Sequence, residues 1–127
     1  MKKVNFSIAK RIKSFGFAFN GLRILFHEEH NSRIHFFASV LVVIAALLFK
    51  LNTYEWFAII FSIGLVVTAE IINTAVENIA DFLTTEQNNH IKKIKDLAAA
   101  AVLVSALTAL TIGLIIFLPK ITTWANL

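Results

Sequence analysis

The sequence contains no cysteine, only one proline and only four glycines among its 127 residues. Without cysteine the chain can form neither a disulfide framework nor a thiolate metal site. Because proline and glycine mark most turns and helix ends, their scarcity leaves little room for loops. No internal repeat or low-complexity segment is visible. We therefore expect a single domain over residues 1–127, built from long regular elements.

Charged residues are also scarce over long stretches. Hydrophobic residues make up 57% of the chain, and the mean hydropathy of +0.74 is too high for an ordinary soluble domain. The net charge of +4 is compatible with nucleic acid or with an anionic membrane surface. The hydrophobicity favours the membrane. The basic N-terminus runs into an amphipathic segment, so we expect no cleavable signal peptide.

Residues 4–26 have the pattern of an amphipathic helix. Apolar side chains recur at steps of three and four residues, at Ile8, Ile12, Phe15, Phe19, Leu22 and Phe26. This spacing places them on one stripe of a helix, with basic residues on the remainder. Such a helix suits the plane of an anionic lipid interface, or it can pack against other protein. The sequence leaves both interpretations open.

Three further segments, residues 33–51, 54–83 and 96–118, are predicted to be membrane-spanning helices. A span needs about 20 apolar residues, so the first is marginal in length. The second predicts a helix about 45 Å long. That length exceeds a hydrocarbon core of about 30 Å, so its C-terminal third should emerge into water. The third contains 22 uncharged residues, and we expect Pro119 to end it. Residues 84–95 are expected to form a polar linker.

The basic residues predict an orientation. Residues 1–33 hold seven Lys and Arg, and residues 84–95 hold three, whereas the opposite side holds only Lys50 and Lys120. The positive-inside rule therefore places the N-terminus in the cytoplasm and the C-terminus outside. The third span is rich in alanine, serine and glycine, which allow close helix approach. Three spans enclose little space, so we expect oligomerisation through these small-residue faces.

The strongest chemical signal is a polar stripe on the second span. Glu70, Asn73, Glu77 and Asp81 are spaced by three, four and four residues and so share one helix face. An acidic residue deep in a bilayer costs about 2.5–3.5 kcal/mol on insertion scales, which makes it a functional candidate. Carboxylates here could hold Mg²⁺ or deprotonate a hydroxyl. A stripe that simply leaves the membrane is the alternative, and it is strongest for Asp81.

Other candidate groups lie near the same end of the spans. Lys95 and Asp96 begin the third span and could supply a cation and a further carboxylate, or serve as a membrane anchor and a helix-dipole charge. In residues 27–30, two histidines flank Glu28 and Glu29 without the spacing of a zinc motif, and Glu29 is the more plausible metal ligand. Neither a P-loop nor a protein-kinase motif is present. The residues alone thus indicate a cation-binding membrane protein with an interfacial acidic site.

Two strings extend this interpretation. Residues 70–81, EIINTAVENIAD, and residues 95–103, KDLAAAAVL, strongly resemble the prokaryotic diacylglycerol kinase family, and the resemblance runs from about Lys10 to Ile121. It implies a homotrimer in the bacterial plasma membrane, with three spans per protomer and active sites shared between protomers. It also implies transfer of phosphate from ATP, with Mg²⁺, to a lipid alcohol.

The resemblance implies roles for individual residues. Glu70 resembles the base that acts on the lipid hydroxyl, with Asn73 beside it, and Glu29 and Glu77 resemble the Mg²⁺ ligands. The positions that resemble nucleotide-binding residues are Lys10, Phe17, Glu29, Glu77, Glu86, Asn88, Lys95 and Asp96. Those implied to bind the lipid substrate are Glu70, Arg33, His35 and Ala99.

Two departures from the family pattern bear on nucleotide binding. Glu86-Gln87-Asn88 stands where the family commonly has Glu-Tyr-His, which affects nucleotide affinity or base selectivity. Phe17 stands where a tyrosine is often found, so a hydroxyl is lost although the ring can still pack against adenine.

The substrate prediction rests on a shorter string. Residues 31–35, NSRIH, resemble the N-x-R-I-H string of the Gram-positive branch, whose members act as undecaprenol kinases, and residues 113–121 resemble the same branch. We therefore favour undecaprenol over diacylglycerol. A non-enzymatic cation-binding membrane protein and a cation transporter are the competing hypotheses. Neither requires Glu29, Glu70, Glu77, Lys95 and Asp96 together.

Overall fold

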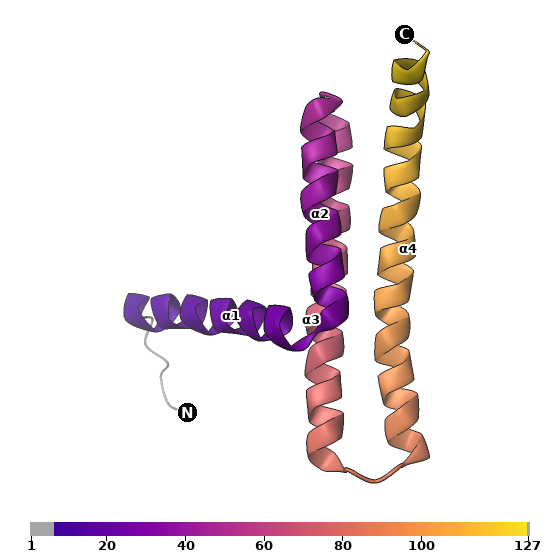
Figure 1. The fold of residues 1–127 in the computed structure, drawn as a ribbon. Helices are drawn as coiled ribbons and strands as arrows, with labels where there is room; N and C mark the ends of the chain where they lie inside the picture. The colour runs from indigo at the N-terminus through magenta and orange to yellow at the C-terminus, as the bar shows by residue number, and fades with distance from the viewer. Residues whose placement is uncertain (1–6, 127) are drawn as a thin grey trace.

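The computed structural model describes residues 7–126, which fold into four α-helices (Figure 1). They are α1 (Ile8–Glu28), α2 (His30–Leu48), α3 (Thr53–Leu83) and α4 (Asn89–Ala125). The last three are long and apolar enough to cross a membrane. The prediction of an all-α membrane protein with an N-terminal helix and three spans is thereby confirmed. Residues 4–6, the expected start of the first helix, lie outside the described residues.

A sharp bend at Glu29 separates α1 from α2. Glu29 has extended backbone angles (φ −102°, ψ 115°), and its N–H donates to the Leu25 carbonyl at 3.1 Å, which closes α1. From this bend α1 projects sideways from the spans, on the side away from α4 (Figure 1). Of its residues only Leu25 is buried, and the predicted apolar stripe is exposed in the single chain. This direction and exposure suit a helix that lies in a membrane interface.

A tight turn joins α2 to α3. Lys50 adopts a left-handed conformation (φ 51°), and the Leu51 N–H donates back to the Ala46 carbonyl at 3.1 Å. Asn52 then caps α3: its side chain accepts from two backbone N–H groups while the Glu55 carboxylate accepts from the Asn52 N–H. This reciprocal capping starts α3 abruptly. The helix α2 accordingly spans residues 30–48, displaced by three residues at each end from the predicted 33–51.

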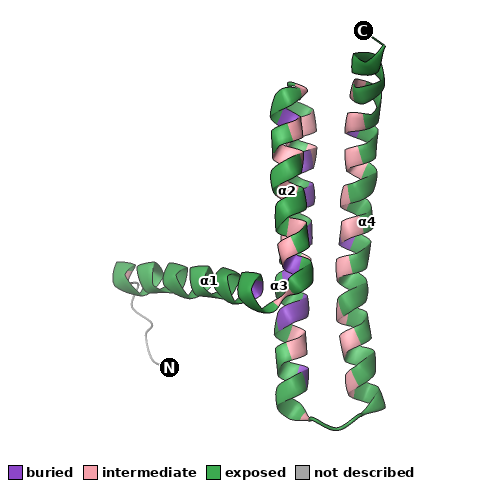
Figure 2. Cartoon of the chain, in the orientation of Figure 1, coloured by how far each residue is buried: buried purple, intermediate pink, exposed green. Residues whose placement is uncertain are grey.

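The apolar core lies beside this turn. Ala46, Leu51, Ile59 and Ile116 form it, and the Phe49 and Phe117 rings meet edge to face at 6.1 Å. Outside this core, most residues of α1 and α4 are exposed (Figure 2). The outward faces of the spans are therefore available to lipid or to other copies of the chain.

The structure corrects the predicted ends of the third span. Pro119 does not end it: α4 runs through Pro119 to Ala125, although proline removes one helical hydrogen bond. Membrane helices tolerate proline when their surroundings support the freed groups. Here Ile116 packs in the core just before Pro119, and Lys120 just after it is 3.0 Å from the Glu55 carboxylate. At its other end α4 begins at Asn89, so the predicted linker shrinks to residues 84–88.

Candidate functional site

The polar stripe of α3 begins at the level where α1 joins the spans. Glu70 shares a groove with Leu25 and Phe26 near the end of α1, and from Glu70 α3 continues for 13 residues, about 20 Å, to Leu83. If α1 marks the membrane interface, Glu70 lies at the interface, whereas Glu77 and Asp81 lie on the aqueous side of it. The stripe thus begins at the buried Glu70, beside apolar side chains, and ends at the exposed Asp81.

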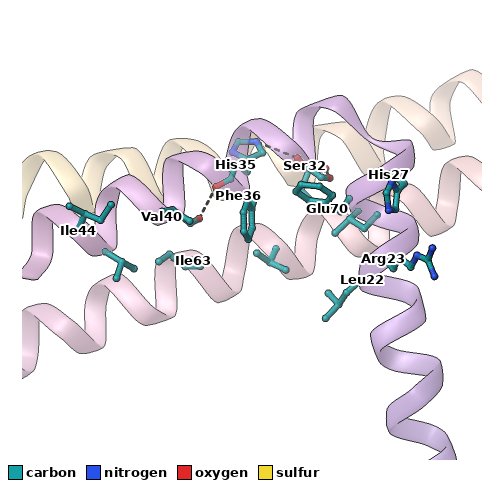
Figure 3. A pocket seen from close by; sticks show the side chains of 15 residues that line it. Leu22, Arg23, His27, Ser32, His35, Phe36, Val40, Ile44, Ile63 and Glu70 are labelled. Atoms are coloured by element: carbon teal, nitrogen blue, oxygen red, sulfur yellow. Dashed lines mark hydrogen bonds and ion pairs between the residues drawn. The ribbon is translucent and has the colours of Figure 1, made fainter.

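Glu70 is deeply buried, with a side chain only 3% exposed. Ser32 of α2 donates from Oγ to Glu70 Oε2 at 3.2 Å, and His35 Nε2 lies 3.2 Å from Oε1 (Figure 3). The contact with His35 lacks hydrogen-bond alignment, so Oε1 has no hydrogen-bond partner among the described residues. One helix face of α2 thus contacts both oxygens, because residues three apart are neighbours on a helix. The sequence analysis assigned no role to Ser32, because its contact with Glu70 depends on how α2 packs against α3.

An apolar groove of about 690 Å³ leads to this carboxylate. Helices α1, α2 and α3 form it, and most of the side chains that line it are apolar (Figure 3). Among them are Leu22, Phe26, Phe36, Val40, Ile44 and Ile63. Ser32, His35 and Glu70 bring polar atoms into it. Such a groove suits a hydrocarbon chain with one polar group at the carboxylate.

Two neighbours of Glu70 on α3 are buried with unpaired polar atoms. Asn73 Oδ1 and Thr74 Oγ1 have no hydrogen-bond partner among the described residues. Several other helical Ser and Thr hydroxyls donate to a carbonyl of their own helix, as Ser62 does to Ala58. Leaving a buried polar atom unpaired costs about 1–3 kcal/mol. These atoms are therefore candidates to contact a ligand, and Thr74 was not among the predicted site residues.

The two predicted metal ligands come from different elements. Glu29 lies at the bend between α1 and α2, and Glu77 lies two turns beyond Glu70 on α3. Partial burial raises the pKa of the Glu29 carboxyl, and the negative charges of Glu77, Glu70 and Glu28 raise it further. A cation would relieve this repulsion. No cluster of three or more metal-ligating side chains occurs within residues 7–126. Two carboxylates nevertheless suffice for Mg²⁺ when substrate phosphates complete the shell.

A second, polar cavity of about 650 Å³ lies where α3 turns into α4. It brings together the predicted residues Glu86, Asn88, Lys95 and Asp96, with Asp81 at its wall. Lys95 Nζ donates to Asp81 Oδ1 at 2.9 Å, whereas Asp96 pairs with Lys92 on its own helix. The Asn88 side-chain oxygen accepts from the His90 N–H at 2.8 Å and so caps α4. The cavity combines both signs of charge beside a helix N-terminus.

The remaining predicted residues lie elsewhere. Lys10 and Phe17 are exposed on α1, where the Lys13 ammonium lies 5.9 Å from the Phe17 ring centroid. Because α1 projects away from α4, neither residue reaches the polar cavity of its own chain (Figure 1). Arg33 is half-buried with its Nε unpaired among the described residues, and Ala99 is exposed on α4.

The fold and the site together define a helical integral membrane protein whose buried carboxylate ends an apolar groove. The sequence model of the prokaryotic diacylglycerol kinase family matches residues 16–117, and the chain belongs to this family. It is therefore a lipid kinase that uses ATP as its co-substrate, a membrane protein of a bacterial family.

The similar proteins are of two kinds, undecaprenol kinase and diacylglycerol kinase. The chain is 38% identical to an undecaprenol kinase of Bacillus subtilis, over 86% of this chain and 89% of the relative. It is 35% identical to a diacylglycerol kinase of Synechocystis, over 85% of this chain and 62% of the relative. It is 31% identical to a diacylglycerol kinase of Escherichia coli, over 77% and 80%.

Proposed function

We propose that this lipid kinase transfers the γ-phosphate of ATP to the hydroxyl of undecaprenol. The observation that carries the proposal is the Glu70 carboxylate, buried at an apolar groove of about 690 Å³. A long polyisoprenoid alcohol has the chemistry that such a groove accepts: hydrocarbon with a single hydroxyl. The resemblance of residues 31–35 to undecaprenol kinases and the 38% identity to one of them support this substrate.

In this mechanism Glu70 is the general base. Its Oε1, which has no hydrogen-bond partner among the described residues, accepts the hydroxyl proton as the lipid oxygen bonds to the γ-phosphorus. The bond from the γ-phosphorus to the bridging oxygen breaks, and ADP leaves. Ser32 fixes the other carboxylate oxygen, and Asn73, one turn along α3, offers a buried amide to the reacting groups. Phosphoryl transfer depends largely on such positioning and on charge neutralisation.

Glu29 and Glu77 would hold Mg²⁺. Their mutual repulsion supports the assignment, because a divalent cation offsets two neighbouring carboxylates. The bound metal would neutralise charge on the ATP phosphates.

The polar cavity would bind the nucleotide. Lys95 would contact the phosphates while Asp81 holds its ammonium, and Glu86, Asn88 and Asp96 would line the remainder. We assign Lys10 and Phe17 to the nucleotide as well, and Arg33, His35 and Ala99 to the lipid side.

The dispersion of these residues supports shared active sites. Lys10 and Phe17 lie on α1, on the opposite side of the spans from the polar cavity (Figure 1). A complete site then needs α1 of one copy beside α4 of another. We therefore propose a homotrimer in the bacterial plasma membrane, with the N-terminus in the cytoplasm, where ATP is available and where the basic residues concentrate.

Diacylglycerol is the second candidate substrate. A further cavity of about 450 Å³, between α2, α3 and α4, shares His35, Ser39 and Ile63 with the groove. Two apolar spaces on either side of α2 could take the two chains of a glycerolipid.

The test is Mg²⁺-ATP turnover by purified protein in mixed micelles, with undecaprenol and dioleoylglycerol assayed in parallel. The proposal predicts a higher kcat/KM with undecaprenol. A higher kcat/KM with dioleoylglycerol would keep the kinase but replace its substrate. Turnover of neither lipid by folded protein would contradict the assigned chemistry.

A further inference from the structure

The burial of Glu70 raises the question of how its carboxyl group loses the proton that it accepts as a base. A base that takes a proton in each turnover must lose it before the next, yet the Glu70 side chain is 3% exposed. The groove beside it is mostly apolar, and a hydrocarbon chain would displace water from it. The proton therefore needs a neighbouring group that can accept it and reach water.

His35 contacts this carboxylate and is only partly covered by the rest of the chain. Its Nε2 lies 3.2 Å from Glu70 Oε1, the oxygen without a hydrogen-bond partner, and its side chain is 29% exposed. It lines both the groove and the cavity of about 450 Å³ between α2, α3 and α4, so it reaches from the buried carboxylate toward the space on the other side of α2. Ser32 occupies the opposite oxygen, Oε2. A hydroxyl proton accepted at Oε1 is thus placed next to an imidazole.

Other charged or titratable groups near His35 are few in the described part of the chain. Helix α3 contributes Glu70, and α1 contributes Arg23 and His27 to the shared groove. The α4 residues that line the cavity of about 450 Å³ are apolar or glycine. Of the two α2 side chains that contact the Glu70 carboxylate, Ser32 and His35, only the imidazole has a ring nitrogen that can take up a proton.

We propose that His35 is the outlet for the proton that Glu70 takes from the lipid hydroxyl. After transfer, the proton passes from Glu70 Oε1 to His35 Nε2, and the imidazolium releases the proton of its other ring nitrogen, Nδ1, to water. Proton exchange with water then returns the neutral ring to the tautomer whose Nε2 is free to accept. The carboxylate is thereby regenerated, and no other reactant is consumed. This inference rests on the proposed role of Glu70 as the base. It gives His35 a role distinct from contact with the substrate.

A purely structural His35 makes a different prediction. Glutamine at this position can hydrogen-bond to the carboxylate but cannot carry a proton. A structural role therefore predicts that His35→Gln retains activity, whereas a proton outlet predicts that it does not. His35→Ala leaves a space beside Glu70 in which free imidazole can replace the missing ring.

The experiment measures kcat and the KM for ATP in detergent for the wild type, His35→Gln, His35→Ala and Ser32→Ala, with and without imidazole. The proposal predicts at least a tenfold lower kcat for both His35 variants at an unchanged KM for ATP. It further predicts that imidazole restores His35→Ala alone, in a saturable way. Ser32→Ala is the matched control: it loses positioning of the same carboxylate and gains nothing from imidazole.

Wild-type kcat in His35→Gln, or no recovery of folded His35→Ala at any imidazole concentration, would overturn the proposal. Glu70→Gln separates this failure from failure of the proposed function. If Glu70→Gln is inactive while His35→Gln is fully active, the assignment of Glu70 as the base is retained and the role of His35 as the proton outlet is rejected. If Glu70→Gln turns over normally, the base assignment itself is wrong.

Discussion

Lys95 and Asp81 join the two longest helices beside the polar cavity: Lys95 Nζ lies 2.9 Å from Asp81 Oδ1, although the two residues are 14 positions apart. The lysine side chain is 37% exposed and the aspartate 70%. An ion pair this exposed contributes little to stability, because water screens the two charges. Its significance is therefore positional: it aims the ammonium along the wall of the cavity.

Asp81→Asn should weaken ATP binding with little effect on folding. Without the carboxylate, the Lys95 ammonium samples more orientations, so we expect the KM for ATP to rise several-fold. The KM for the lipid and the unfolding midpoint should change little. Initial rates at varied ATP, together with thermal unfolding in detergent, measure both quantities. An unchanged KM for ATP would show that Asp81 does not position Lys95 for the nucleotide.

Glu29→Gln and Glu77→Gln should each weaken Mg²⁺-dependent ATP binding. Removing either carboxylate leaves a single charge to hold the cation, and the KM for Mg²⁺-ATP should rise at least tenfold. Because the two carboxylates repel each other, Glu77→Gln should also stabilise the metal-free protein.

Glu28→Gln is the matched control for these variants, since Glu28 is exposed and adjacent to Glu29. It should keep the wild-type response to Mg²⁺. Thermal unfolding with and without Mg²⁺-ATP reports the ligand-dependent shift. Equal shifts in wild type, Glu29→Gln and Glu77→Gln would remove both residues from the metal site.

Asn52→Ala should lower stability without affecting catalysis. The Asn52 side chain accepts from the Tyr54 and Glu55 N–H groups at 3.0 Å, at the end of α3 far from Glu70. Loss of such a cap costs about 0.5–2 kcal/mol. We expect a lower unfolding midpoint and an unchanged kcat well below it. A large fall in kcat at low temperature would mean that this turn communicates with the site.

The sequence was sufficient to predict the helices because apolar runs and their interruptions are local signals. The uncharged runs 56–69 and 97–118 lie within α3 and α4, and the run 36–49 lies within α2 except for its last residue, Phe49. The prediction that Pro119 ends the helix was wrong. Proline usually interrupts a helix, but here contacts with residues distant in the sequence support α4 on both sides of Pro119. Glu55 lies 65 positions from Lys120, so no local pattern could indicate their ion pair.

The site was predictable in part for the same reason. The spacing of Glu70, Asn73 and Glu77 placed them on one face, and Glu70 and Asn73 are buried in the structure. Helical periodicity could not reveal that Ser32 and His35 meet Glu70, because that contact depends on how α2 packs against α3. Nor could it show that α1 points away from the polar cavity.

Glu70→Gln, assayed for phosphate transfer from labelled ATP to undecaprenol, tests the central claim most directly. Glutamine keeps the shape of the side chain but cannot accept the hydroxyl proton. Loss of a general base typically lowers a rate by about 10²–10⁴-fold. The account predicts such a fall in kcat with ATP binding retained, while Glu55→Gln, at the other end of α3, stays active. Undiminished formation of undecaprenyl phosphate by Glu70→Gln would contradict it.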